Sequence, residues 1–145
     1  MKAGLRPAAA ADVPAIVVIE GATFPCPWSE RTFYREVEND ISRFKVLALG
    51  DEVIGYYDLW MCGHEAHLLN VAVAVANRGR GYGKMMLQDI IGEARRAECV
   101  RIVLEVRGSN AEAIGLYEAF GFKKVAQTRR YYADGEDADI MLKDV

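Results

Sequence analysis

The stretch LLNVAVAVANRGRGYGKMML, residues 68–87, joins a long apolar run to a segment of three glycines and three cations. The apolar run predicts a buried strand, and the apolar spacing beyond Gly81 predicts a helix that continues to about Arg96. The glycines at positions 79, 81 and 83 therefore lie between a strand and the N terminus of a helix. Unpaired N–H groups and the positive end of the helix dipole meet at such a junction, an arrangement that suits a phosphate group.

Counting positions separates the kinds of phosphate loop that this segment can form. A P-loop requires G-x-x-x-x-G-K followed by Ser or Thr, but Arg78 stands at its first glycine and Met85 at its hydroxyl residue. A dinucleotide loop requires G-x-G-x-x-G, and Lys84 or Met86 replaces its third glycine. The spacing that fits is (Q/R)-x-x-G-x-G over residues 78–83, and a tight turn with solvated arginines is the alternative.

The rest of the chain alternates strand and helix patterns. The expected strands are residues 4–6, 44–49, 53–61, 67–75, 100–106, 124–132 and 137–142. The expected helices are residues 13–21 after Asp12, a segment after Ser29, residues 81–96, and residues 110–120, with Asp12, Ser29 and Asn110 as caps. Consecutive early strands pair antiparallel, and the later strand–helix–strand unit pairs parallel. We therefore expect an α/β (α+β) fold with a mixed, mostly antiparallel seven-stranded sheet and helices on both faces.

Length, charge and cysteine content narrow the class of protein. The chain has 145 residues, which predicts one domain over residues 1–145. A net charge of −3 argues against direct nucleic-acid binding, and the absence of a long apolar run argues against a membrane span. Three widely spaced cysteines fit reduced thiols in the cytoplasm. His64-Glu65-Ala66-His67 is one residue short of the zinc motif H-E-x-x-H and precedes a strand, so no metal site is expected.

Two polar residues stand in otherwise apolar segments. Glu105 interrupts the run VRIVLEV and shares a strand face with Val103 and Arg107. A carboxylate there needs a partner or a purpose, so it either pairs with Arg107 or Arg101 or acts as a general base. Tyr117 lies on the apolar stripe of its helix, where it is either a core tyrosine or a functional phenol.

The loop at 78–83 resembles the acyl-coenzyme-A pyrophosphate loop of the GNAT superfamily of N-acetyltransferases. LEVRGSNAEAIGLYEAFGF at 104–122 resembles its protein N-terminal acetyltransferase branch, in particular the bacterial ribosomal-protein alanine N-acetyltransferases. Three further stretches resemble the same branch: PWSE at 27–30, NVAV at 70–73 and RRYYADGEDADIM at 129–141.

This resemblance implies the GNAT fold and an acyltransferase that uses acetyl-CoA as cosubstrate, without a metal. It implies direct acetyl transfer to the N-terminal amine, with alanine of a small-subunit ribosomal protein as the acceptor. The partners would be acetyl-CoA, CoA and a protein N-terminal peptide. Acetylation of a lysine or a small-molecule amine, or a non-catalytic acyl-CoA-binding module, stays open.

The resemblance also implies roles for single residues. Glu105 would be the general base, and Tyr117 would protonate the departing thiolate. The implied cofactor-binding residues are Val71, Ala72, Val73, Arg78, Gly79, Arg80, Gly81, Tyr82, Gly83, Lys84 and Asn110. Separately, Trp28, Tyr131 and Tyr132 are aromatic residues in expected loops, which suits binding of a peptide end or, equally, a local hydrophobic plug.

Overall fold

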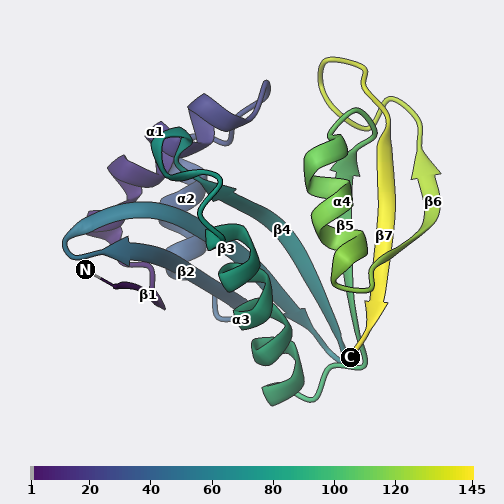
Figure 1. The fold of residues 1–145 in the computed structure, drawn as a ribbon, viewed down its shortest axis with the longest axis horizontal. Coiled ribbons are helices and arrows are strands. Elements are labelled where there is room, and N and C mark those ends of the chain that lie inside the picture. The colour runs from purple at the N-terminus through teal and green to yellow at the C-terminus, as the bar shows by residue number, and fades with distance from the viewer. Residues whose placement is uncertain (1) are drawn as a thin grey trace.

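Residues 2–145, the part of the chain that this computed structural model describes, form one seven-stranded sheet flanked by four α-helices (Figure 1). The strands are β1 Ala3–Pro7, β2 Ser42–Leu49, β3 Glu52–Cys62, β4 Glu65–Val73, β5 Arg101–Arg107, β6 Lys123–Thr128 and β7 Ala138–Asp144. The helices are α1 Val13–Thr23, α2 Glu30–Val37, α3 Tyr82–Arg96 and α4 Ala111–Ala119, with 3-10 turns at Ala10–Asp12 and Val75–Asn77. The strand order is β1-β2-β3-β4-β5-β7-β6, and β4–β5 is the parallel pair among antiparallel ones. The expected fold class is confirmed.

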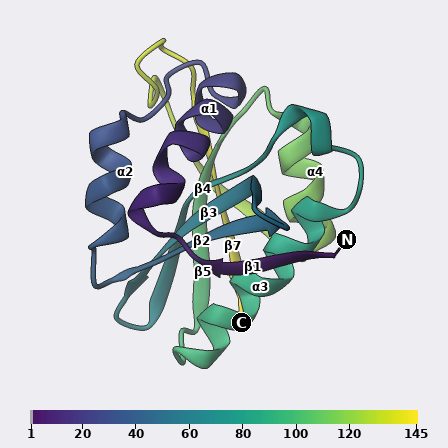
Figure 2. The same ribbon diagram turned by 90° about the vertical axis from the view of Figure 1, so that its left-hand side faces the viewer.

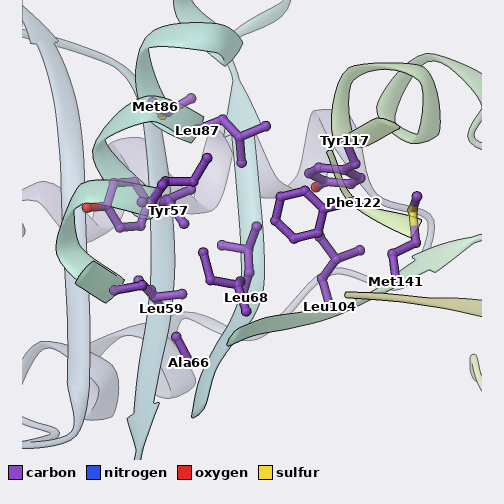
Figure 3. Close-up of a cluster of buried hydrophobic side chains, with 14 of the residues drawn as sticks. Tyr57, Leu59, Ala66, Leu68, Met86, Leu87, Leu104, Tyr117, Phe122 and Met141 are labelled. Atoms are coloured by element: carbon purple, nitrogen blue, oxygen red, sulfur yellow. The ribbon is translucent and has the colours of Figure 1, made fainter. Parts of the chain in front are cut away.

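Each face of the sheet carries its own hydrophobic cluster. α1 and α2 cover one face and α3 and α4 the other (Figure 2). The cluster under α3 and α4 contains Leu87, Ile90, Ile91 and Ala94, the apolar stripe of α3, as the helical spacing predicted. Figure 3 shows this cluster, with Tyr117 and Phe122 together at one end. Within residues 2–145, no helix has the length and apolar character needed to cross a membrane.

β4 and β5 pair over only part of their length. Their register runs from Glu65↔Arg101 to Leu68↔Leu104, although both strands continue beyond these residues. On its other side, β4 shifts register against β3 at Leu69, where one extra residue forms a β-bulge. A bulge bends its strand, so β4 turns away from β5 at the position where their pairing ends. The two strands spread apart toward their C-terminal ends (Figure 1).

Two local expectations were wrong. Asp12 precedes α1 but does not cap it with its side chain, because its carboxylate accepts hydrogen bonds from Arg6 and from the Ala9 N–H. The strand expected over 124–132 ends at Thr128, so the connection between β6 and β7 is a longer loop than expected, residues 129–137. The caps at Ser29 and Asn110 are confirmed, since each side chain accepts a backbone N–H from its helix.

A pair of buried carboxyl groups joins α2 to β3. Asp58 is fully buried, its Oδ1 accepts a hydrogen bond from Ser42, and its Oδ2 meets no N–H or hydroxyl donor within residues 2–145. Burial, together with a hydrogen bond to Glu36, raises the pKa of Asp58 to about 8. Trp60 and Asn39 donate to Glu36 at 2.6 and 3.2 Å. Asp58 therefore carries the proton that the two carboxyl groups share.

This pair predicts a pH-dependent stability. The bound proton stabilises the fold fully below pH 3.8, the usual Asp pKa, and this stabilisation is lost as the pH rises to about 8. Asp58→Asn keeps a donor toward Glu36 and cannot ionise, so its urea-unfolding midpoint should fall less than that of the wild type between about pH 5 and about pH 9. Asp51→Asn, in the exposed β2–β3 turn, is the control and should follow the wild type. If the unfolding midpoint of Asp58→Asn changed with pH in parallel with that of the wild type, Asp58 and Glu36 would not share a proton.

Candidate active site

The opening between β4 and β5 leads into two adjoining clefts. The first, of about 450 Å³, lies among the end of β4, the glycine loop and the N termini of α3 and α4. The second, of about 300 Å³, lies among β4, β5, the loop at 24–28 and the tyrosines at 131–132. Val71, Asn110 and Tyr117 line both clefts, so the clefts meet where the strands part.

The glycine loop presents backbone amides to the first cleft. Gly79 and Gly81 have φ angles of +77° and +83°, which favour glycine, and a Cβ at either would meet no neighbour. Gly81 is the N-cap of α3, so the N–H groups of its first turn have no partner within the helix. A third glycine, Gly83, allows a close approach of α4, because a Cβ there would lie 3.3 Å from Leu116. The loop therefore presents unpaired backbone N–H groups to the first cleft, an arrangement that suits an anion.

The structure brings most of the predicted cofactor-binding residues to this cleft. Its lining includes Val71, Ala72, Val73, Arg78, Gly79, Gly81, Tyr82, Gly83 and Asn110. Arg80 and Lys84 are exposed and do not line it. The Arg78 guanidinium donates hydrogen bonds to the Val73 carbonyl and the Thr23 hydroxyl, both at 3.0 Å. Arg78 therefore ties the end of β4 to α1, and its guanidinium is engaged within the protein.

Glu105 pairs with a residue that was not expected. It lies on the half-buried face of β5 with Val103 and Arg107, as the alternation predicted. Its Oε1 is 3.2 Å from Nε2 of His67 on β4. Arg107 instead pairs with acidic residues of the 129–137 loop, and Arg101 lies 4.0 Å from Glu65. Both arginine alternatives for Glu105 were therefore wrong.

Tyr117 stands at the junction of the two clefts. It is only 7% exposed and packs on Phe122, with ring centroids 5.7 Å apart (Figure 3). Burial, with a small contribution from Tyr132, raises the pKa of its phenol, and no hydrogen bond to a described residue contributes. The phenol therefore stays protonated at neutral pH and is free to donate into the clefts.

Trp28, Tyr131 and Tyr132 all line the second cleft. Trp28 also packs on Phe33, with ring centroids 5.5 Å apart, so it belongs partly to the α1–α2 cluster. The two tyrosine rings meet edge to face at 5.0 Å. The three aromatic side chains therefore form a wall of the second cleft and also pack locally, so both features expected of them are present.

Arg107 holds the tyrosine loop against the sheet. Its Nη1 lies 2.8 Å from Asp134 and 2.9 Å from Glu136, and its guanidinium lies 4.0 Å from the centre of the Tyr132 ring. Glu136 also accepts a hydrogen bond from the Ser109 N–H at 3.0 Å. These contacts draw residues 129–137 toward the end of β5, which explains why β6 is shorter than predicted.

Sequence reasoning missed a buried carboxylate, Glu20 of α1, in the wall of the second cleft. It is 1% exposed and accepts hydrogen bonds from the Tyr56 hydroxyl, the Asn70 side chain at 2.8 Å and the Trp28 N–H at 2.7 Å. Glu20 therefore connects α1, the bent part of β4 and the aromatic loop. The available signal was its position four residues after Ile16, on the buried stripe of the helix.

Comparisons with known proteins agree with this architecture. Residues 13–122 match the family described as Acetyltransferase (GNAT) family. The ribosomal protein bS18-alanine N-acetyltransferase of Salmonella typhimurium is 39% identical over 133 residues, 90% of this chain and 89% of that protein. The N-alpha-acetyltransferase of Sulfurisphaera tokodaii is 33% identical over 152 residues, 94% of this chain and 90% of that protein.

A solved structure gives the same result. The crystal structure of the ribosomal-protein-S18-alanine N-acetyltransferase from Escherichia coli matches with a TM-score of 0.91 at 32% identity. The match covers 99% of this chain and 94% of that chain. The sequence match and the structural match both extend over most of the chain, and both lead to the same conclusion. The chain belongs to the GNAT acetyltransferase family and is an N-acetyltransferase.

Proposed function

We propose that the protein transfers an acetyl group from acetyl-CoA to the N-terminal amine of a protein, with alanine of a small-subunit ribosomal protein such as bS18 as the acceptor. The observation that carries this proposal is the placement of Glu105 and Tyr117. Glu105 lines the second cleft, and Tyr117 lines both clefts where they meet. A base on the acceptor side and an acid at the junction suit direct transfer between two bound substrates.

The first cleft has the features that acetyl-CoA requires. The free amides of the glycine loop and of the first turn of α3 suit the pyrophosphate. Beyond Leu68 the backbone of β4 pairs with β3 but has no partner on β5, which leaves some polar groups at Val71–Val73 for the amides of the pantetheine arm, the Val73 carbonyl being taken by Arg78. Asn110 caps α4 with its Oδ1, and its NH₂ group remains for the ligand. When bound there, acetyl-CoA supplies an acetyl group activated as a thioester.

The second cleft suits an N-terminal peptide. Trp28, Tyr131 and Tyr132 provide an aromatic wall, and Glu105 supplies a carboxylate toward a terminal ammonium group. An α-amine has a pKa of about 7.7–8.0, so part of it must lose a proton before it can attack. Glu105 takes this proton directly or through a water, and Tyr117 donates its phenolic proton to the departing thiolate.

We also propose that residues 1–145 act as one N-acetyltransferase domain in the cytoplasm. Both hydrophobic clusters share one sheet, and each contributes walls to the adjoining clefts. The free state of Cys26, Cys62 and Cys99 is in keeping with a reducing compartment.

A peptide panel tests the proposed acceptor. Peptides that begin with alanine should gain one acetyl group in the presence of acetyl-CoA, as measured by mass spectrometry. The same peptides with a blocked N terminus should not react. Acetylation that persists on blocked, lysine-containing peptides would indicate a lysine acetyltransferase, and binding of acetyl-CoA without any turnover would indicate a binding module. Either result would reject the proposed function.

Substitution of the acid and the base should affect turnover more than binding. Glu105→Gln and Tyr117→Phe should each lower kcat by about 10²–10⁴-fold, the usual contribution of general acid–base groups. The Kd for acetyl-CoA, measured by calorimetry, should stay close to the wild-type value. If both variants turned over at the wild-type rate, Glu105 would not be the general base and Tyr117 would not be the general acid.

The glycine loop can be tested with a matched pair of variants. Gly81→Ala should weaken acetyl-CoA binding by up to about tenfold, because relief of about 1–2 kcal/mol of left-handed strain moves the loop amides. Gly63→Ala is the control, since Gly63 also has a positive φ, +65°, and open space, but lies in the β3–β4 turn. Equal affinities in calorimetry would contradict an amide cradle at this loop.

A further inference from the structure

We propose that His67 is the positioning and proton-accepting partner of Glu105, so that the two side chains act as one base during acetyl transfer. This inference rests on the proposed function, because it concerns the proton that the acceptor amine must lose. It gives a role to a residue that the sequence offered only as part of an incomplete zinc motif.

The geometry places His67 behind Glu105 as seen from the cleft. Their side chains meet at 3.2 Å between Nε2 and Oε1. Glu105 lines the second cleft, whereas His67 does not. The His67 side chain keeps 32% of its surface exposed and that of Glu105 keeps 21%. Glu105 thus contacts the cleft, and His67 contacts Glu105 from outside the cleft lining with part of its own surface open to solvent, so the pair offers a path for a proton to leave the site.

The pairing comes from the sheet register. His67 lies opposite Val103 in the last paired segment of β4 and β5, one step before Leu68↔Leu104. Glu105 is the first residue of β5 beyond that paired segment, on the same face as Val103. Glu105 thus stands at the start of the opening, where its side chain reaches both His67 and the second cleft.

The surroundings of His67 favour its protonated form. The hydrogen bond to Glu105 raises the pKa of His67; partial burial opposes this, and the negative charges of Glu105 and Glu65 add to the increase. On β3, the residue opposite His67 is Trp60, which does not titrate. From the loop, Tyr131 faces Glu105, and burial together with that carboxylate raises the pKa of its phenol. An imidazole beside these groups is a stronger base than a carboxylate alone.

The proton balance is simple. The acceptor ammonium gives one proton to Glu105 and keeps the electron pair for its attack on the acetyl carbon. Neutral His67, with its own proton on Nδ1, takes this proton from Glu105 at Nε2. Glu105 returns to a carboxylate that is paired with an imidazolium, and the imidazolium releases a proton to solvent. The second proton, which the attacking nitrogen loses as the amide forms, replaces the proton that Tyr117 gives to the departing thiolate, so the reaction releases one proton in all.

The test compares His67→Gln with His64→Gln by following kcat against pH. The exposed His64 is the other histidine of the chain and lies in the β3–β4 turn, so its variant should match the wild type. In the wild type, kcat should fall as the pH drops through the raised pKa of His67. His67→Gln should lower the kcat plateau by about 10²-fold, the lower end for a general base. Its acid limb should move to lower pH while both KM values stay unchanged.

Two further measurements separate a chemical role from a structural one. Added imidazole should restore part of the activity of His67→Ala, since the site is open to solvent. In NMR titrations without substrates, the pKa of His67 should lie above 6.5, its ordinary value, and should fall in Glu105→Gln.

Several outcomes would overturn the inference. Unchanged kcat and pH profile in His67→Gln would do so, as would a loss confined to KM. If the wild type acetylates no peptide, the proposed function fails, but the NMR titration still decides this inference. An unchanged His67 pKa in Glu105→Gln would then reject the coupled pair.

Discussion

The parting of β4 from β5 is the constraint on which the site depends. If the two strands stayed paired beyond Leu68 and Leu104, the backbone groups of Val71–Val73 would be used within the sheet. The sheet would also separate Glu105, on the α1–α2 face, from Tyr117, on the opposite face. The bulge at Leu69 bends β4, and the opening joins the two faces.

The bend is held by a buried carboxylate. Glu20 accepts a hydrogen bond from Asn70, the first residue after the bulge, and also fixes the backbone at Trp28. Burial of a charge is costly unless it is well paired, and here three donors satisfy it. One side chain thus links the shape of the strand to the position of the aromatic loop. Arg107 has a similar linking role at the opposite wall of the second cleft, where it anchors the loop that carries Tyr131 and Tyr132.

Local patterns predicted much of the fold. Helical spacing and caps located α2, α3 and α4, and the order of strands and helices predicted a mixed sheet with one parallel pair. The failures have a common cause. Residues 129–132 have strand-like side chains, but Arg107 holds the following acidic residues, Asp134 and Glu136. Asp12 has the character of a cap, but Arg6 across the turn takes its carboxylate. In each case an arginine outside the predicted element competes with the local preference.

The sequence by itself determined the glycine loop, its place between strand and helix, and the face of β5 that carries Glu105, because these follow from periods and spacings along a continuous segment. Only the tertiary structure decided where the strands part and which side chain meets Glu105. The choice of His67 over Arg101 or Arg107 depends on the register of two separate strands, which brings together residues 38 positions apart in the sequence. A shift of that register by one residue would turn the side chains of one strand to the opposite face. The register is set by the packing of the whole sheet against its helices, which no local pattern contains.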